Sequence, residues 1–141
     1  MRLMCLLMMK KISHGMNKSL TIEGVPKAQK RHRFGKGFVY DPSKQDKAQL
    51  LPLLRSRFSS LPTAKPVGVA LVFYMPIPKS YTKKKKALMQ DEEYPHTNKP
   101  DTDNMVKFYL DCLPFDDKVI YKIEAEKIYS PRPRVEMLIL Y

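Results

Sequence analysis

The chain has 141 residues, of which 43% are hydrophobic and 28% charged, and its formal net charge is +12. This composition is typical of one folded globular domain and excludes an intrinsically disordered chain. No stretch reaches the roughly 18 apolar residues that cross a membrane, so we expect no membrane partner. The two cysteines, Cys5 and Cys112, are too few for a disulfide framework or a cysteine-based zinc site and fit a reducing compartment.

The charge is divided unevenly along the chain. Residues 1–90 contain 19 lysine and arginine residues against three acidic residues, whereas residues 91–141 contain seven against eleven. A strongly basic body favours a polyanionic partner, because each phosphate that is neutralised releases counterions. Carboxylates that face phosphates repel them unless a divalent cation lies between. The pattern therefore indicates a metal-dependent enzyme that acts on a phosphodiester.

The first residues differ from the rest of the chain. Arg2 precedes a short apolar run at residues 3–9, which Lys10 and Lys11 follow. The run is too short for a secretory signal peptide and lacks a small-residue cleavage site. We expect residues 1–16 to be a leader, disordered or produced by an upstream start site, and residues 17–141 to form the domain.

The first half of the domain contains three predicted elements. Alternating apolar residues predict a short strand at residues 20–25, and the basic, glycine-containing segment 27–36 predicts a loop or hairpin that leads into residues 38–40. An aspartate followed by proline predicts the start of a helix over residues 41–59. Because proline removes a helical hydrogen bond, we expect a bend or a restart at Pro52.

The second half alternates between apolar runs and a long polar excursion. Residues 67–74 predict a strand buried on both faces, and residues 76–100 predict a long loop with one or two helical turns at 83–90. Two further strands are expected at 119–127 and 135–141. With a helix between the loop and these strands, the order predicts an α+β fold, a two-layer sandwich in which two main helices pack on a small mixed sheet.

The helix after the long loop carries the most informative side chains. We expect Asp103 or Asn104 to cap it. An apolar stripe at helical spacing should be buried, namely Val106, Tyr109, Leu110 and Leu113. Asp103, Lys107 and Asp111 are spaced four residues apart and should lie along one edge of the same helix.

Acidic residues around this helix predict a metal site. If Asp101 is extended, its carboxylate and that of Asp103 can point towards one spot at the helix N-terminus, and Asp116-Asp117 can bring a third carboxylate alongside. Carboxylates without a histidine or cysteine pair favour Mg²⁺ or Mn²⁺ over zinc. The helix N-terminus and Lys107 would place positive potential where a phosphate lies. Such a site can activate water and stabilise the transition state of phosphodiester hydrolysis.

Each of these features also has an ordinary structural explanation. Asp103 alone can be a helix cap, and its spacing from Lys107 can reflect exposed ion pairing. Asp116-Asp117 is a common turn sequence, and the lysine run at 83–86 is often a solvated face. These alternatives stay open for the single features; the joint pattern favours the metal site.

The joint pattern resembles a known family. Lys99-Pro100-Asp101-x-Asp103-Asn104-x-x-Lys107, followed by Asp111, Asp116-Asp117 and Ile120, resembles the RusA family of Holliday junction resolvases. Residues 75–81 and 96–98 are similar to the phage-type members, and the resemblance covers roughly residues 20–141. It implies a Mg²⁺-dependent homodimeric endonuclease that cuts paired strands of four-way DNA junctions. It also implies a cytoplasmic location in a bacterial or phage-infected cell.

The resemblance also assigns roles to single residues. Asp101, Asp103 and Asp117 match the metal-binding acids, Asp116 is an accessory ligand, and Lys107 matches the essential lysine. We expect basic residues to hold the DNA backbone, namely Lys99, Lys30, Arg31, Arg33, Lys83, Lys84, Lys85 and Lys86. The link at residues 112–115 is shorter than in many relatives, so metal binding depends on whether this link brings the acid pair inward. Two alternatives remain: a catalytically silent nucleic-acid-binding module of the same fold, and a nuclease for other substrates such as flaps, forks or RNA.

Overall fold

The computed structural model describes residues 16–61 and 65–141. The expected leader therefore lies, except for Met16, outside the described residues. Met16 exchanges two backbone hydrogen bonds with Tyr141, of 2.9 and 3.1 Å. Met16 thus continues the backbone pairing of the first strand by one residue, although that strand begins at Asn17.

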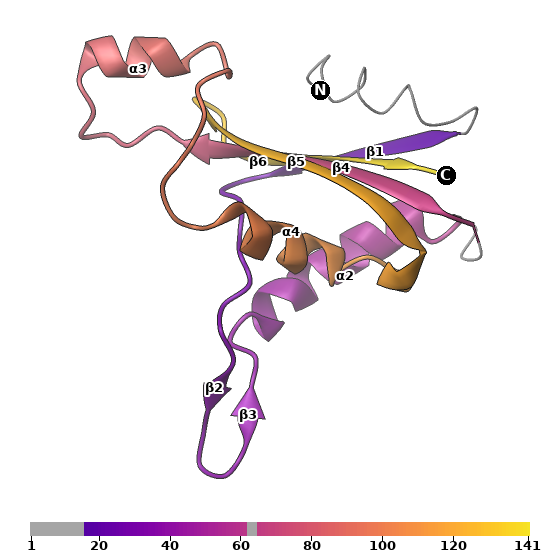
Figure 1. The fold of residues 1–141 in the computed structure, drawn as a ribbon. Helices are drawn as coiled ribbons and strands as arrows, with labels where there is room; N and C mark the ends of the chain where they lie inside the picture. Colours follow the sequence, from indigo (N-terminus) through magenta and orange to yellow (C-terminus); the bar gives the residue numbers. More distant parts are fainter. Residues whose placement is uncertain (1–15, 62–64) are drawn as a thin grey trace.

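Two layers make up the described part of the chain. Its elements are β1 (Asn17–Glu23), β2 (Arg33–Phe34), β3 (Val39–Tyr40), α2 (Lys44–Phe58), β4 (Val67–Pro76), α3 (Lys83–Met89), α4 (Thr102–Leu110), the 3₁₀ turn η1 (Asp117–Val119), β5 (Ile120–Ser130) and β6 (Arg134–Leu140). The main sheet has the order β1-β6-β4-β5, in which only β4 and β5 are parallel. Helices α2 and α4 lie on the same side of this sheet (Figure 1). The predicted α+β sandwich with a mixed sheet and two main helices is confirmed.

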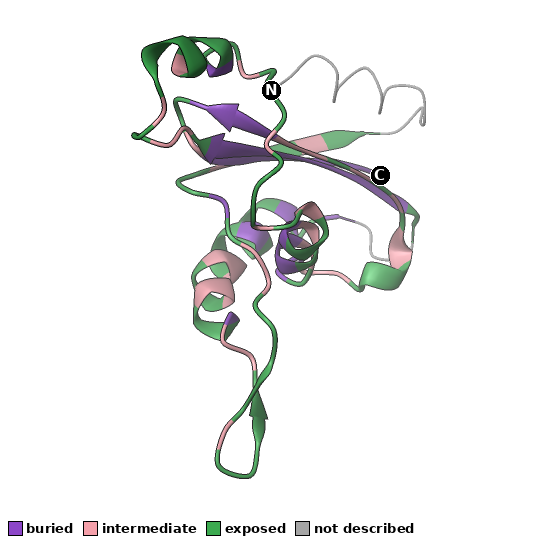
Figure 2. Cartoon of the chain, turned by 60° about the vertical axis from the view of Figure 1, so that its left-hand side comes forward, coloured by how far each residue is buried: buried purple, intermediate pink, exposed green. Residues whose placement is uncertain are grey.

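The core lies between the sheet and these two helices. Strand β4 is buried over its whole length except at Pro76, as predicted. Its side chains alternate between two clusters, so that Leu71 and Phe73 pack with Phe58 of α2 and Phe108 of α4, whereas Tyr74 belongs to a second cluster on the other face. Buried positions follow the strands and the inner sides of both helices (Figure 2). The core therefore fixes α4 against the middle of the sheet.

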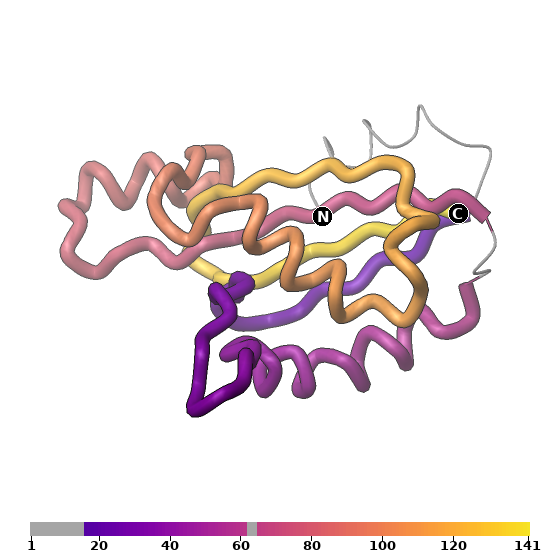
Figure 3. The backbone as a smooth tube through the Cα atoms, turned by 60° about the horizontal axis from the view of Figure 1, so that its bottom comes forward, coloured from indigo at the N-terminus to yellow at the C-terminus, as the bar shows by residue number. Residues whose placement is uncertain are grey.

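Helix α2 differs from its prediction at both positions of interest. It begins at Lys44 rather than at Asp41, and the Asp41 carboxylate accepts a hydrogen bond of 2.8 Å from the backbone N–H of Ser43. The helix then passes Pro52 without a second start, so the expected restart is wrong (Figure 3). Proline frees the carbonyl of Ala48, four residues earlier, and Ala48 is exposed, so water can satisfy that group.

The predicted hairpin is formed by β2 and β3, which pair Arg33 with Tyr40 and Phe34 with Val39. It projects away from the sheet and the helices (Figure 1). Gly37 has a φ of +82°, a conformation that residues with a side chain rarely adopt, in the turn between the strands. The turn glycines recognised in the sequence therefore have a direct structural reason.

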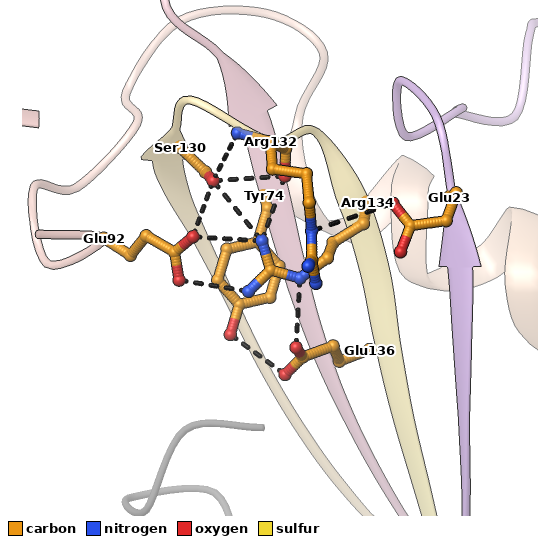
Figure 4. A network of polar contacts seen from close by, with 7 residues as sticks. All are labelled: Glu23, Tyr74, Glu92, Ser130, Arg132, Arg134 and Glu136. Atoms are coloured by element: carbon orange, nitrogen blue, oxygen red, sulfur yellow. Dashed lines mark hydrogen bonds and ion pairs between the residues drawn. The ribbon is translucent and has the colours of Figure 1, made fainter. Parts of the chain in front are cut away.

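The long loop after β4 contains α3, as predicted, and a polar network ties its end to the sheet (Figure 4). Arg134 of β6 donates hydrogen bonds of 3.0 Å to Glu92 of the loop and to Glu136 of β6, and Glu136 accepts one from the Tyr74 hydroxyl at 3.0 Å. The side chains of Arg134 and Glu136 are only 7% and 4% exposed. The loop is thus anchored next to the buried end of β4.

No helix in the described ranges is long and apolar enough to pass through a lipid bilayer.

Candidate active site

Helix α4 starts earlier than predicted. Its first residue is Thr102, and Asp101 occupies the N-cap position with an extended backbone, φ −71° and ψ 143°. The predicted cap at Asp103 or Asn104 is therefore wrong, because both residues lie within the first turn. The Asp101 side chain makes no capping hydrogen bond. The carboxylate and the first amide groups of the helix thus remain available to a ligand.

The buried face of α4 is rotated from the predicted stripe. The buried positions are Met105, Phe108, Tyr109, Cys112 and Leu113. Tyr109 and Leu113 were predicted correctly, but Val106 and Leu110 are only half-buried. The helix is apolar at so many positions that two stripes fit the same 3.6-residue period, and only packing on the sheet selects one.

Val106 and Leu110 instead line an open depression of about 500 Å³, which we call the Asp103 hollow. Its wall residues are Thr102, Asp103, Val106, Lys107, Leu110, Asp111 and Asp117. Asp103, Lys107 and Asp111 line it together because residues four apart share one side of a helix. Asp117 lines the same hollow from η1, so the short link at residues 112–115 leaves one residue of the acid pair on this side of α4.

Asp101 lies elsewhere. It lines a second depression of about 720 Å³, the Asp101 hollow, with Ala28, Gln29, Lys30, Arg31, Lys99, Pro100 and Asn104. The Asp101 hollow and the Asp103 hollow share no lining residue, so the two carboxylates border different depressions. Among the described residues no group of three or more His, Cys, Asp or Glu side chains could hold a metal ion. The expected meeting of three carboxylates is therefore not found.

A third hollow, of about 240 Å³, shares lining residues with each of the first two. It is lined by Gln29, Lys30, Arg31, His32, Asn104 and Lys107. Lys107 is shared with the Asp103 hollow, and Lys30 and Arg31 are shared with the Asp101 hollow. Basic side chains therefore lie between the two sets of carboxylates.

Asp116 has a local structural role. Its carboxylate accepts a 3.0 Å hydrogen bond from the backbone N–H of Lys118 and caps η1. This hydrogen bond lowers the pKa of Asp116, and the nearby Lys118 ammonium adds to the effect. Asp116 is not among the residues that line the Asp103 hollow. We therefore leave it out of the metal ligands proposed below.

Ion pairing along α4 does not explain the spacing of its charged residues. Asp111 pairs with Lys47 of α2 at 3.0 Å, and Lys47 also binds Asp41 at 3.1 Å. Burial works to lower the pKa of Lys47, but its two carboxylate partners raise it above the ordinary value. Neither Asp103 nor Lys107 forms an ion pair with any residue that the structure describes. Both charges are thus free to meet a ligand.

Lys127 of β5 is a site residue that the sequence did not identify. Its ammonium donates to the backbone carbonyls of Asn98 and Pro100 and lies near Asp101. Burial lowers the pKa of Lys127, against the opposing effect of the Asp101 carboxylate. In the sequence Lys127 is one of several charged residues along a strand. Only its pairing with the core residue Phe73 shows that it faces the helix side of the sheet.

The predicted DNA-binding residues occupy two regions on either side of α4. Lys99, Lys30 and Arg31 line the Asp101 hollow, and Arg33 lies on the exposed hairpin. The lysines of the other region, Lys83, Lys84, Lys85 and Lys86, belong to α3. The hairpin and α3 lie at opposite ends of the molecule with α4 between them (Figures 1 and 2).

The donors around α4 suit magnesium. Magnesium is usually bound by one or two carboxylates, with water and substrate phosphate completing its octahedral coordination. Asp103 and Asp117 supply two exposed carboxylates in one hollow, and the residues that line this hollow include no histidine or cysteine. The donor set therefore fits a hard divalent cation whose remaining ligands come from solvent and phosphate.

Comparison with known proteins identifies the family of this chain. Residues 23–139 match the sequence model of the family described as endodeoxyribonuclease RusA. This chain belongs to the RusA family. It is also 36% identical over 132 residues to the uncharacterized protein YqaN of Bacillus subtilis (strain 168), across 84% of this chain and 92% of that protein. The RusA match includes the hairpin, α4 and Asp117, and it assigns the chain to the endodeoxyribonucleases.

Proposed function

We propose that this RusA-family chain is a Mg²⁺-dependent endonuclease that resolves four-way DNA junctions by paired phosphodiester hydrolysis. The observation that supports the proposal is the Asp103 hollow, which Asp103 and Lys107 of α4 line together with Asp117 of η1. These residues form an open surface that a phosphodiester backbone can reach, in a chain of an endodeoxyribonuclease family.

Each residue has a role that follows from its position. Asp103 and Asp117 would hold the cation. Asp101 would supply a further metal-binding carboxylate from the Asp101 hollow. A bound Mg²⁺, with Mn²⁺ as a substitute, supplies a Lewis acid that makes water a better nucleophile at neutral pH. Lys107 lies one turn after Asp103 and would balance the negative charge that develops on the phosphoryl group. The uncapped amide groups at the start of α4 would orient the phosphate.

The basic residues on either side of α4 would bind the arms of the junction. Lys30, Arg31 and Lys99 lie next to the carboxylates, and α3 carries four consecutive lysines at the other end of the molecule. Paired cuts require two sites, and a two-fold homodimer matches the two-fold symmetry of the junction. We place this activity in the cytoplasm of a bacterial or phage-infected cell, where branched DNA arises.

Three variants test the proposal: Asp101→Asn, Asp117→Asn and Lys107→Ala. With a labelled four-way junction in Mg²⁺, each variant should cut about 10²- to 10³-fold more slowly than the unaltered chain. Junction binding by Asp117→Asn should be retained or tightened, because a carboxylate that faces phosphate is removed. Asp91→Asn, at an exposed loop position, is the matched control and should cut normally.

Three outcomes would contradict the proposal. Undiminished cutting by Asp101→Asn or Asp117→Asn would remove that residue from the site. Junction binding without cleavage of any branched substrate in Mg²⁺ or Mn²⁺ would indicate the silent module. Preference for forks or flaps over four-way junctions, measured at one salt concentration, would indicate another substrate, and salt must be fixed because phosphate contacts dominate affinity.

A further inference from the structure

The β2–β3 hairpin exposes an apolar face. Phe34 is 87% exposed and Val39, which pairs with it across the two strands, is 56% exposed. Directly opposite residues in an antiparallel pair lie on the same side of the ribbon. Phe34 and Val39 therefore form one continuous apolar surface at the end of a projecting element.

The hairpin has a defined turn. The backbone N–H of Gly35 donates a 2.7 Å hydrogen bond to the carbonyl of Phe38. The Phe38 ring lies against Gly35 so closely that a Cβ there would be 2.9 Å from it, and the ring is 6.0 Å from that of Tyr40. Phe38 thus supports the turn, and Phe34 is the most exposed aromatic residue of the hairpin, at 87% against 60% for Phe38 and 41% for Tyr40.

The charge around this face indicates what it contacts. Between Glu23 and Asp41 the chain has no acidic residue, and it carries five basic ones, namely Lys27, Lys30, Arg31, Arg33 and Lys36. An exposed aromatic side chain among basic residues matches a partner with phosphates and open flat apolar surfaces. Unpaired nucleic-acid bases have this combination, because each base has a face on which an aromatic ring can stack. Bases within a continuous duplex already stack on each other.

The hairpin is fixed next to the candidate active site. The backbone N–H of Gln29 donates a 2.9 Å hydrogen bond to the carbonyl of Asn104 in the first turn of α4. Lys30 and Arg31 line one hollow together with Lys107. Lys36 at the tip follows Lys30 by six positions in the chain, which is at most about 20 Å of extended chain. A DNA strand held at Lys107 can therefore pass beside the hairpin.

We propose that Phe34 stacks on a base left unpaired at the branch point and thereby makes binding selective for branched DNA over continuous duplex. This inference rests on the proposed function for its substrate. Val39 extends the stacking surface, and Arg33 and Lys36 contact the adjacent phosphates. Phe34 thus determines where on the DNA the carboxylates are placed, whereas the lysines and arginines supply affinity for any duplex.

Binding without cleavage tests this inference. Affinities are measured in EDTA at one salt concentration, for a four-way junction and for a duplex with the same arm sequence. Phe34→Ala should weaken junction binding about 5- to 150-fold, the loss of one stacked base, and leave duplex binding unchanged. Phe34→Trp should retain junction binding, whereas Phe34→Leu should lose most of it although it stays apolar. Leu53→Ala, at a 42% exposed position of α2, is the matched control and should bind both substrates normally.

A fluorescent base analogue at the branch point adds a direct readout. 2-Aminopurine there should be quenched when the unaltered chain or Phe34→Trp binds, and not when Phe34→Ala binds. The inference would be overturned if Phe34→Ala weakened the binding of junction and duplex equally, or weakened neither. Either result would indicate that this face binds a protein partner instead. Normal thermal unfolding of Phe34→Ala by circular dichroism would show that the comparison concerns folded protein.

The same experiments separate this inference from the proposed function. A chain that binds junctions in a Phe34-dependent manner but never cleaves them supports the stacking role and contradicts the nuclease. A chain that cleaves junctions, with a Phe34→Ala variant that keeps the full preference for junction over duplex, contradicts the stacking role alone.

Discussion

Replacing Arg134 with methionine should destabilise the domain by about 3–5 kcal/mol, because it removes the guanidinium that donates hydrogen bonds to both Glu92 and Glu136 in the network of Figure 4. Methionine keeps much of the buried volume and the contact with the Tyr74 ring, over which the guanidinium lies at 3.6 Å. The change therefore tests mainly the loss of charge and hydrogen bonds.

The magnitude follows from the exposure of the two carboxylates. Glu136 is 4% exposed and Glu92 is 28% exposed. Without Arg134, Glu92 can turn towards water, so the loss of its ion pair costs at most about 1 kcal/mol of stability, as for other partly exposed pairs. Glu136 must remain buried beside the Tyr74 hydroxyl, and the loss of the charge-assisted hydrogen bond from Arg134 to this buried carboxylate accounts for the larger share. Adding Glu136→Gln to Arg134→Met should therefore restore at least about 2 kcal/mol, since the amide is neutral and can still accept from Tyr74.

Urea unfolding measures both effects. With a slope of about 1.5 kcal/mol/M, a loss of 4 kcal/mol lowers the midpoint by about 2.5 M. Arg132→Ala is the control, because Arg132 is 62% exposed and lies 3.8 Å from Glu23, and it should cost less than about 0.5 kcal/mol. A loss below about 1 kcal/mol for Arg134→Met at unchanged slope, or further destabilisation by Glu136→Gln, would refute the reasoning.

Two further predictions concern single groups. Burial works to raise the pKa of Asp41, but hydrogen bonds from Ser43, Lys47 and Gln29 lower it to about 2. Because the unfolded value is about 3.9, the stabilisation is complete above pH 4 and is lost as the pH falls towards 2. Asp41→Asn should reduce the change of the urea midpoint with pH over this range. An unchanged dependence of the midpoint on pH would contradict the prediction. Burial raises the pKa of Cys112 to about 11. In a Cys5→Ser variant, a thiol reagent should therefore modify Cys112 only as fast as the chain unfolds. Rapid labelling of the native protein would contradict this prediction.

Elements that depend on local sequence could be predicted. The apolar run of β4 identified a strand buried on both faces, and the glycines around Lys36 identified the hairpin. Strand alternation and turn chemistry act over a few neighbouring residues, so they are visible without knowledge of the fold. The charged residues at 103, 107 and 111 also came to one side of α4, because helical spacing alone decides this.

Features that depend on packing could not be predicted in the same way. Two apolar stripes of α4 could have been the buried one, and only packing on the sheet determines which of them is buried. The positions of Asp101 and Asp103 depend on where the helix begins, and that point lies two or three residues before the predicted one. Lys127 became a site residue only through its strand pairing, and the exposure of Phe34 required the three-dimensional position of the hairpin.

The separation of charge along the sequence becomes a separation in space. Acidic residues at 101, 103 and 117 border the hollows beside α4, and basic residues lie on the hairpin root and on α3, at its two sides. A site made only of those carboxylates would repel DNA, and a surface made only of lysines would bind it without positioning any phosphodiester bond. The cations of the hairpin root and α3 can supply the affinity, while Asp101, Asp103 and Asp117 form no ion pair with any residue that the structure describes. Pairing Asp103 with Lys107 would have added at most about 0.5 kcal/mol of helix stability, and their separation leaves both charges available to a cation and a phosphate.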